Sequence, residues 1–279
     1  MALQITSLNS GSNGNCYYIG NDTEAVLVDT GISCKETEKR MFSLGLTMQK
    51  VKAVFISHEH TDHIKGLQVI ASKYDLPVYI SHDTYTKSGL QLPTETLQWI
   101  DTKKNVKIGT LEITSFTKKH DAADPHSFII SCNGLTVGVF TDIGAACSNV
   151  TKHFNLCHAA FLEANYDEVM LENGHYPIYL KNRIRGGQGH LSNKQALEIF
   201  TTHRPAFMSH LFLSHLSKDN NDPILVQRLF ENHSLNTKII VASRYKATQV
   251  FSLEKTIPEI ANTKKIKTKI NVSQMGMFD

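Results

Sequence analysis

The sequence predicts an α+β protein in which two β-sheets pack face to face and helices cover their outer faces. Two observations support this fold class. Both halves of the 279-residue chain contain short apolar segments bounded by turn-forming residues, and both also contain segments with helical spacing of apolar residues. Every sheet and helix must bury its apolar face against another element, and a sandwich of this kind satisfies all of them.

The first half of the chain begins with strands and then alternates helices with strands. Strands are expected where short apolar segments lie between Gly, Asn, Asp and Ser, and helices where apolar residues recur every three or four positions. In chain order, the sequence predicts strands over 3–10, 16–20 and 24–31, a helix over 33–46, a strand over 52–57, a helix over 63–74 and a strand over 77–81.

The second half contains the same kinds of element. Asn133 and Gly134 lie between two apolar segments, and Asn-Gly is the preferred pair in two-residue hairpin turns. In chain order, the remaining predictions are a strand over 110–117, a hairpin over 127–142, a strand over 159–165, a helix over 192–205, a strand over 207–217, a helix over 222–234 and strands within 238–253.

Composition predicts an ordinary globular protein. The chain is 41% hydrophobic and 20% charged, and its net charge of +3 is too small to require a polyanionic partner. The five cysteines are scattered and form no Cys-x-x-Cys pair, which argues against a disulfide framework or a thiolate zinc site. Neither a secretory signal nor an apolar run of about 18 residues is visible. We therefore expect a cytoplasmic protein with no membrane segment, for which a monomer is acceptable.

A cluster of ligand-type side chains directly follows the strand predicted over 52–57. The segment FISHEHTDHIKG has the pattern His-x-His-x-Asp-His. Side chains two positions apart in an extended segment share a side, so His58 and His60 can bind one ion. Asp62 and His63 turn away around a helix start and can bind a second. Imidazole and carboxylate suit zinc, manganese or iron. The alternative is an exposed polar turn, but four ligand-type residues at this spacing argue against it.

This pattern resembles the signature of the metallo-β-lactamase superfamily, which consists of metal-dependent hydrolases with an αββα four-layer sandwich. The resemblance implies further ligands at later strand ends, and FTKKHDAADPHSF, GVFTDIG and LFLSHLS contain them in order. It implies two divalent ions, zinc or manganese, with His58, His60 and His120 on one, Asp62, His63 and His215 on the other, and Asp142 bridging. Asp29 of AVLVDTG would orient ligands through hydrogen bonds. His126 is an alternative to His120.

Other segments resemble the nuclease branch of this superfamily, which includes ribonuclease Z. GQGHLSNKQALEIF, followed by LFLSHLS, implies a catalytic histidine, and FLEAN supplies its acidic partner. The catalytic residues so implied are Asp62, His190 and Glu163. For His190, the alternative is a cap before the helix that starts near Ser192. Only 47 residues separate Asp142 from His190, which leaves no room for the inserted domain of β-CASP nucleases.

The chain also resembles the YycJ-type proteins, which are small exonucleases of DNA metabolism, in SLNSGSNGNCYYI, LEANYDEVML, YPIYLKNRIRGGQGHLSN and LSHLSKDNNDP. We therefore expect a dinuclear-metal phosphodiester hydrolase, namely a 5′-to-3′ DNA exonuclease of DNA repair or replication. The alternatives are a small-molecule hydrolase of the same fold, such as a thioesterase or cyclic phosphodiesterase, an RNA-processing nuclease, or a metal-binding scaffold. Against a β-lactamase, an aspartate takes the bridging position, and Cys147 lies five residues beyond it.

Two segments are candidates for contact with nucleic acid. NSGSNGN, with Asn13 and Asn15, has glycines and small polar residues that can present backbone N–H groups to phosphate. A simple hairpin turn is the alternative. YLKNRIRGG offers Lys181, Arg183 and Arg185 shortly before the catalytic histidine, and such cations commonly contact phosphate. A solvated face explains them nearly as well.

The end of the chain predicts a separate segment. A hydrolase domain over 1–255 is followed by a polar, lysine-rich tail over 256–279 that ends in Gln-Met-Gly-Met-Phe-Asp. This ending resembles the QLxLF-type peptides that bind the bacterial sliding clamp. The anchors it implies are Gln274, Met275, Met277 and Phe278. Exposed Met and Phe on a polar tether favour a docking role. The alternatives are a tail that packs onto the domain and a chance match.

Overall fold

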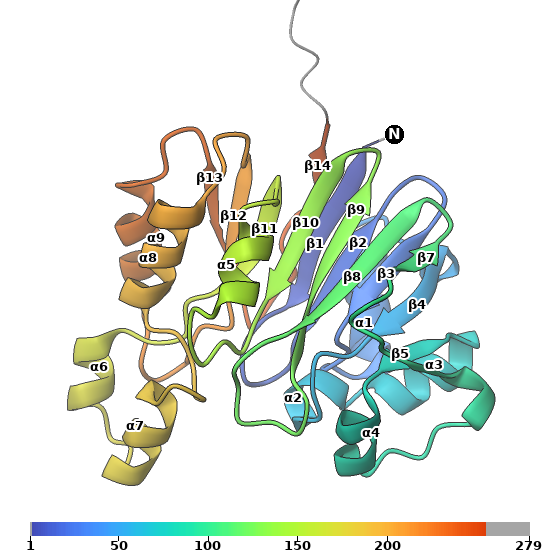
Figure 1. The fold of residues 1–279 in the computed structure, drawn as a ribbon, viewed down its shortest axis with the longest axis horizontal. Helices are drawn as coiled ribbons and strands as arrows, with labels where there is room; N and C mark the ends of the chain where they lie inside the picture. The colour runs from blue at the N-terminus through green and yellow to red at the C-terminus, as the bar shows by residue number, and fades with distance from the viewer. Residues whose placement is uncertain (1, 255–279) are drawn as a thin grey trace, which may run out of the picture.

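The computed structural model describes residues 2–254, which form two seven-stranded sheets packed face to face with helices on the outer faces (Figure 1). The predicted αββα sandwich is confirmed. The boundary predicted between domain and tail and the clamp-docking segment, with Gln274, Met275, Met277 and Phe278, lie outside the described residues.

The first sheet combines an antiparallel and a parallel part. In spatial order it consists of β14 (Phe251–Leu253), β1 (Leu3–Asn9), β2 (Cys16–Gly20), β3 (Ala25–Val28), β4 (Val51–Phe55), β5 (Val78–Ile80) and β6 (Leu97–Trp99). Neighbours from β14 to β3 are antiparallel, and those from β3 to β6 are parallel. Leu3 pairs with Leu253, so the last described strand returns to the first sheet.

The second sheet has the same mixed character. In spatial order it consists of β13 (Lys238–Val241), β12 (His210–Ser214), β11 (Ala159–Glu163), β10 (Leu135–Phe140), β9 (His126–Cys132), β8 (Leu111–Thr117) and β7 (Val106–Ile108). Strands β10 to β13 are parallel. The hairpin predicted at Asn133 and Gly134 joins β9 to β10, and both residues have positive φ angles, 51° and 74°. This is the conformation that favours Asn-Gly.

Five helices cover the outer faces of the sheets. They are α1 (Cys34–Ser43) and α3 (Leu67–Tyr74) on the first sheet, and α5 (Ser148–Phe154), α8 (Asn193–His203) and α9 (Pro223–Glu231) on the second. Ser33 caps α1 by accepting a hydrogen bond from the amide of Glu36. Ser192 and Gln195 form a capping box at the start of α8.

Three apolar clusters correspond to the three interfaces of this four-layer fold. One lies between the sheets and includes Phe55, Phe128 and Phe161. The second lies between the second sheet and its helices, and the third between the first sheet and its helices. Because strands in the middle of such a sandwich are covered on both faces, β2 and β3 are buried along their whole length rather than alternating.

Several short elements were not predicted. These are the strands β6 and β7, the helices α4 (His82–Ser88), α5, α6 (Glu168–Asn173) and α7 (Ile178–Arg185), and two 3₁₀ turns at Met48–Lys50 and Thr94–Thr96. The helices α4, α6 and α7 lie with the short helix α2 (Thr61–Ile64) at one end of the sandwich (Figure 1). The helix predicted over 63–74 is two helices, α2 and α3, that separate at Gly66. A Cβ atom on Gly66 would lie 2.1 Å from the carbonyl oxygen of Ile32. The close approach of these two backbone segments therefore requires a glycine at this position.

The described residues contain no helix that is both long and apolar enough to cross a membrane. All five cysteines lie within the described residues and are free. Cys16, Cys34, Cys132 and Cys157 are buried, and burial raises the pKa of the Cys16 and Cys157 thiols far above their usual range. These side chains are therefore part of the apolar core.

Candidate metal centre and active site

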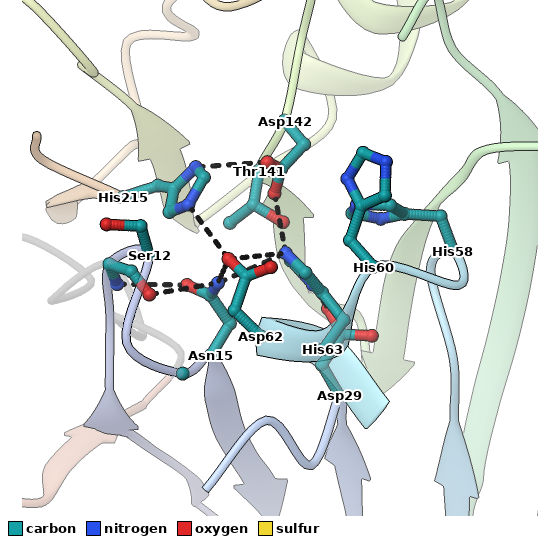
Figure 2. Close-up of polar contacts among 12 residues, drawn as sticks. Ser12, Asn15, Asp29, His58, His60, Asp62, His63, Thr141, Asp142 and His215 are labelled. Atoms are coloured by element: carbon teal, nitrogen blue, oxygen red, sulfur yellow. Dashed lines mark hydrogen bonds and ion pairs between the residues drawn. The ribbon is translucent and has the colours of Figure 1, made fainter. Parts of the chain in front are cut away.

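The candidate site lies where several strands end at one edge of the two sheets. Asp29 follows β3, Asp142 lies two residues after β10, and His215 follows β12. All three have left-handed backbone conformations, with φ angles of 59°, 55° and 55°. Asp and His adopt this conformation more readily than most residues, and strained backbone is common at functional sites. The turns direct the three side chains toward a common centre (Figure 2).

Three histidine nitrogens converge at one side of this centre. Nε2 of His58 lies 3.0 Å from Nδ1 of His60, which lies 3.4 Å from Nε2 of His120. Other groups hold two of these rings from behind: the hydroxyl of Ser57 lies 2.9 Å from Nδ1 of His58, and the carbonyl of Gly189 lies 3.0 Å from Nδ1 of His120. Two nitrogens on one tetrahedral zinc ion, each about 2.0–2.1 Å from it, lie about 3.3 Å apart. The spacing therefore suits a single ion.

The protonation of these rings also suits a metal. Burial lowers the pKa of His58 well below its usual range and lowers that of His120 to about 4. Both rings are therefore neutral at pH 7. Because a metal binds the neutral form of imidazole, protons do not compete for these two nitrogens near neutral pH.

A second group of ligand atoms lies next to the first. Oδ2 of Asp62 lies 3.6 Å from Nε2 of His63 and 3.5 Å from Nε2 of His215. Asp29 lies behind His63, with Oδ2 2.7 Å from Nδ1 of that ring. The other oxygen of Asp29 accepts a hydrogen bond from the backbone N–H of Ser57. Asp29 therefore fixes both the orientation of His63 and the segment that leads into His58.

Asp142 lies between the two groups. Its Oδ2 is 3.1 Å from Nε2 of His63, and its Oδ1 is 3.8 Å from Nε2 of His120 and 3.1 Å from Nδ1 of His215. The side chain is almost fully buried. Burial favours the neutral acid, but the imidazoles of His215 and His63 outweigh burial and hold the pKa of Asp142 well below its usual range. Asp142 is thus an ionised carboxylate that contacts both groups.

Two observations show that divalent cations fit this centre. Oδ2 of Asp142 and Nε2 of His215 are buried and contact other candidate ligands, Nε2 of His63 at 3.1 Å and Oδ2 of Asp62 at 3.5 Å, so that the ligand atoms face one another around a common position. Burial also opposes a charge on His63, yet the carboxylates of Asp142, Asp29 and Asp62 raise the pKa of its ring to about 10. A centre that holds a proton so strongly attracts positive charge, and imidazole and carboxylate are ligands for zinc or manganese.

Glu163, at the end of β11, organises the side of the centre opposite Asp29. Its Oε1 lies 2.8 Å from Nδ1 of His190 and 3.1 Å from Nδ1 of His215. Its Oε2 accepts hydrogen bonds from the backbone N–H groups of Ile143 and Leu191. Burial opposes ionisation, but the charge and hydrogen bonding of His190 and the hydrogen bond with His215 lower the pKa of Glu163 to about 2. The sequence pointed to the partnership with His190 but not to that with His215.

Asn15 is buried beside a candidate ligand, whereas the sequence predicted a surface contact with phosphate. The sequence indicated a contact with phosphate, but the residue is fully buried. Its Nδ2 donates to Oδ2 of Asp62 at 3.2 Å, and its backbone N–H donates to the carbonyl of Asp62 at 2.7 Å. Asn15 therefore orients a candidate ligand, and a buried amide is out of reach of a polymer backbone. Asn13 lies at the surface, where it donates to the carbonyl of Arg244.

Lys118 is a further residue beside the site that the sequence analysis did not identify. It is 7% exposed, and its Nζ donates to the carbonyl of Thr141, next to Asp142. Burial lowers its pKa, against the opposing charges of nearby carboxylates. His126, the predicted alternative to His120, lies at the start of β9 with Nδ1 2.9 Å from the carbonyl of Asp124. It belongs to none of the described groups of converging ligand atoms.

The three predicted cations before His190 lie on α7, an exposed helix at the site end of the molecule (Figure 1). Each has a protein partner. Lys181 donates to the carbonyl of Glu172, Arg185 pairs with the carboxylate of Glu172 at 2.9 Å, and Arg183 pairs with Asp121 at 2.5 Å. The pair of Arg183 and Asp121 links α7 to the loop that carries His120, and the two contacts with Glu172 link it to α6. Phosphate contact by these side chains stays a prediction.

Comparison with known proteins gives the family. The sequence profile of the metallo-beta-lactamase superfamily matches residues 10–146. Exodeoxyribonuclease YycJ of Bacillus anthracis is 36% identical over 225 residues, which cover 79% of this chain and 85% of that protein. Exodeoxyribonuclease WalJ of Streptococcus pneumoniae is 28% identical over 251 residues, which cover 88% of this chain and 93% of that protein.

Solved structures show the same fold. The metallo-beta-lactamase fold protein YhfI from Bacillus subtilis superposes with a TM-score of 0.69 at 18% identity, over 90% of this chain and all of that one. The shared fold, the profile match and the identity to YycJ agree with the converging histidines and acids described above. The chain therefore belongs to the metallo-β-lactamase superfamily, as a YycJ-type protein.

Proposed function

We propose that this protein is a two-metal phosphodiester hydrolase that degrades DNA from the 5′ end. The observation that carries the proposal is the pair formed by His190 and Glu163 beside the candidate ligands. Glu163 holds Nδ1 of His190 at 2.8 Å, so Nε2 of the ring points away from this carboxylate. The side chain of His190 is 20% exposed, whereas that of Glu163 is fully buried. His190 is thus a ring that a substrate entering the centre can contact.

The proposed assignment of the ions follows the two groups of ligand atoms. One ion would be held by His58, His60 and His120, the other by Asp62, His63 and His215, with Asp142 between them. Two divalent ions, zinc or manganese, supply acidification of the attacking water and compensation of the negative charge that develops on phosphate. Asp29, Asn15 and Glu163 fix the directions of the ligands, which preserves the geometry that such chemistry requires.

The protein groups then complete the reaction. Water attacks phosphorus, and the bond between phosphorus and the 3′-oxygen of the terminal nucleotide breaks. His190, oriented by Glu163, donates a proton to the leaving 3′-oxygen or stabilises its developing charge. Asp62, whose Oδ2 lies among the candidate ligand atoms, would help to position the attacking water. The products are a nucleotide with a free 3′-hydroxyl and a shortened strand with a new 5′-phosphate.

The choice of DNA rests on the relatives. Both YycJ of Bacillus anthracis and WalJ of Streptococcus pneumoniae are named exodeoxyribonucleases, which supports DNA as the polymer and an end as the point of attack. The 5′-to-3′ direction, a role in DNA repair or replication and a cytoplasmic location are further parts of the proposal. Docking of the C-terminal segment to a sliding clamp would bring the protein to newly made DNA.

The proposal is tested by comparing substrates and end labels. Duplex and single-stranded DNA labelled at the 5′-phosphate, the same strands labelled at the 3′ end, matching RNA, a thioester and a cyclic dinucleotide are incubated with enzyme and Mn²⁺ or Zn²⁺. We expect early release of labelled mononucleotide from the 5′ label, abolished in Asp142→Ala and retained in Asp83→Ala, whose target side chain is 72% exposed. Early release of the 3′ label would reverse the direction, and preferential turnover of RNA, thioester or cyclic ester would change the substrate class.

A further inference from the structure

A pocket with a volume of about 470 Å³ lies beside the candidate metal centre. Its walls come from four places: the loop before β2, the loop after β12, the start of α9 and the loop after β13. Ser10 contributes from the first loop and Leu216 from the second. The volume lies within the range of small-molecule sites, about 300–1,000 Å³. A pocket with walls on several sides can hold the end of a nucleic-acid strand more readily than the middle of one.

The charged side chains that line this pocket are all cations. Lys218, Arg244 and Lys246 line it, and within the described chain none of its lining residues is an aspartate or glutamate. Two acids are neighbours in the sequence: Asp219 accepts a hydrogen bond from the hydroxyl of Tyr176, and Asp222 accepts hydrogen bonds from the backbone N–H groups of Ile224 and Leu225 at the start of α9. Such a lining attracts an anion, and guanidinium and ammonium groups are common ligands of phosphate.

Arg244 has an unused donor. Its Nη2 lies 3.3 Å from the hydroxyl of Ser12, whereas its Nη1 is buried without a hydrogen-bond partner among residues 2–254. The loop that carries it is fixed from two sides: Asn13 donates to the carbonyl of Arg244, and Arg40 donates to the carbonyl of Tyr245. The guanidinium is therefore held in place beside the pocket, with one donor group that the described residues leave unsatisfied.

The pocket and the metal centre share a wall. The backbone N–H of His215 donates to the hydroxyl of Ser10, and Leu216, the next residue, lines the pocket. A Cβ atom on Gly11 would lie 3.3 Å from Cβ of Arg244, so the loop packs directly against this arginine. The same loop carries Asn15, which contacts Asp62 (Figure 2). A candidate metal ligand, His215, and a residue that lines the pocket, Leu216, are thus consecutive in the chain.

We infer that this pocket binds the terminal nucleotide of the DNA strand and that Arg244 and Lys218 hold its 5′-phosphate. The inference rests on the proposed function, because attack from the 5′ end places the terminal phosphate one nucleotide from the bond that breaks. Tyr245 lines the pocket and is 72% exposed, so its ring is available to stack on the terminal base. Each turnover leaves a new 5′-phosphate on the DNA strand. The pocket would bind this new phosphate in the next turnover.

The test compares 5′-phosphorylated and 5′-hydroxyl DNA of one sequence with the metal-loaded enzyme. Wild type should prefer the phosphorylated end. Arg244→Gln and Lys218→Gln should each reduce kcat/KM on the phosphorylated end about 10- to 100-fold, through KM, so that the preference falls toward one. Arg228→Gln, an equal charge change on the exposed face of α9 outside the pocket, should behave as wild type. Arg244→Lys should restore part of the preference, which a purely structural role would not require.

Binding by calorimetry separates failure of this inference from failure of the proposed function. A deoxynucleoside 5′-monophosphate should bind wild type and Arg228→Gln equally, and should bind Arg244→Gln and Lys218→Gln about 10- to 100-fold more weakly. Equal binding by all four proteins would overturn the inference, and so would an equal rise in KM for both kinds of DNA end, since it would indicate an internal phosphate. If no DNA is cleaved, the proposed function is wrong and the calorimetry still decides the inference.

Discussion

Glu163 contacts His190 through the same carboxylate oxygen that contacts His215, at distances of 2.8 and 3.1 Å to the two Nδ1 atoms. One buried acid therefore orients both the proposed catalytic ring and a proposed metal ligand. The opposite side of the centre has a similar arrangement, because Asp29 lies 2.7 Å from Nδ1 of His63. Three histidines of the centre, His63, His190 and His215, are thus fixed by carboxylates from behind, which is common at metal sites.

Substitution of this acid should affect catalysis and metal binding together. Glu163→Gln keeps the size of the side chain but removes the charge that orients His190 and His215. We expect kcat and the affinity for one of the two ions each to decrease about 10- to 100-fold. Steady-state kinetics and metal titration check this. Glu198→Gln, on the exposed face of α8, is the control and should change neither. A normal kcat in Glu163→Gln would remove Glu163 from the mechanism.

Gly31 should be sensitive to a single added methyl group. A Cβ atom there would lie 1.6 Å from the carbonyl oxygen of Asp62 and 2.6 Å from the backbone nitrogen of Asn15. We expect Gly31→Ala to displace Asp62, to abolish most activity and to lower the free energy of unfolding by about 1–3 kcal/mol or more. Gly187→Ala, where a Cβ atom would meet open space, should change the free energy of unfolding by less than about 0.5 kcal/mol. Denaturant unfolding of both variants measures these changes in the free energy of unfolding.

Metal uptake should release protons and strengthen with pH. In the metal-free protein, burial opposes a charge on His63, but the carboxylates of Asp142, Asp29 and Asp62 raise its pKa to about 10, so the ring is protonated at pH 7. An ion that binds Nε2 must displace this proton. Calorimetry in buffers of different ionisation enthalpy should show at least one proton released per chain, and affinity should rise up to about tenfold per pH unit between pH 7 and 10.

The raised pKa of His63 also determines how the stability of the metal-free protein depends on pH. A folded-state pKa above the unfolded value stabilises the fold fully below about pH 6.5, and the contribution is lost as pH rises through about 10. The metal-free protein should therefore lose stability between about pH 7 and 10, where the loaded protein does not. Metal affinity independent of pH would contradict the raised pKa of His63.

The sequence was sufficient for most of the fold because the signals are local. The Asn133-Gly134 hairpin and the cap at Ser33 each follow from residues a few positions apart. The placement of β14 does not: Leu253 pairs with Leu3, almost the whole described chain away. The short helix α7 was also missed, because it has no buried residue and hence no apolar face to reveal it.

At the site, the sequence indicated the ligand types and two of the residues that support them, Asp29 and Glu163, but it did not indicate the other supporting residues. The residues around His58, Asp142 and His215 lie in recognisable segments at strand ends. Asn15 and Lys118 carry no comparable signal, since an asparagine in a glycine-rich loop and a lysine in a pair of lysines are ordinary at surfaces. Only the tertiary structure shows that Asn15 is buried against the carboxylate of Asp62 and that buried Lys118 contacts the carbonyl of Thr141, next to Asp142.

The C-terminal segment gives a prediction about a partner. If Gln274, Met275, Met277 and Phe278 are clamp-binding anchors, a chain that ends at Val272 should lose binding to a bacterial sliding clamp while degrading DNA at the wild-type rate. Surface plasmon resonance with an immobilised clamp measures the first, and release of end-labelled nucleotide the second. The matched control is the full chain with Lys264→Gln, which leaves the proposed anchors intact. Unchanged clamp binding after truncation would eliminate the docking role.

The most direct test of the two-metal mechanism is to titrate the metal-free enzyme with Mn²⁺ while measuring mononucleotide release from 5′-labelled DNA. Because Asp142 contacts the ligand atoms of both groups, we predict that activity saturates at two bound ions per chain. We also predict that Asp142→Ala neither binds both ions nor releases nucleotide. Full activity in the presence of a chelator, or nucleotide release by Asp142→Ala at the wild-type rate, would contradict the proposal.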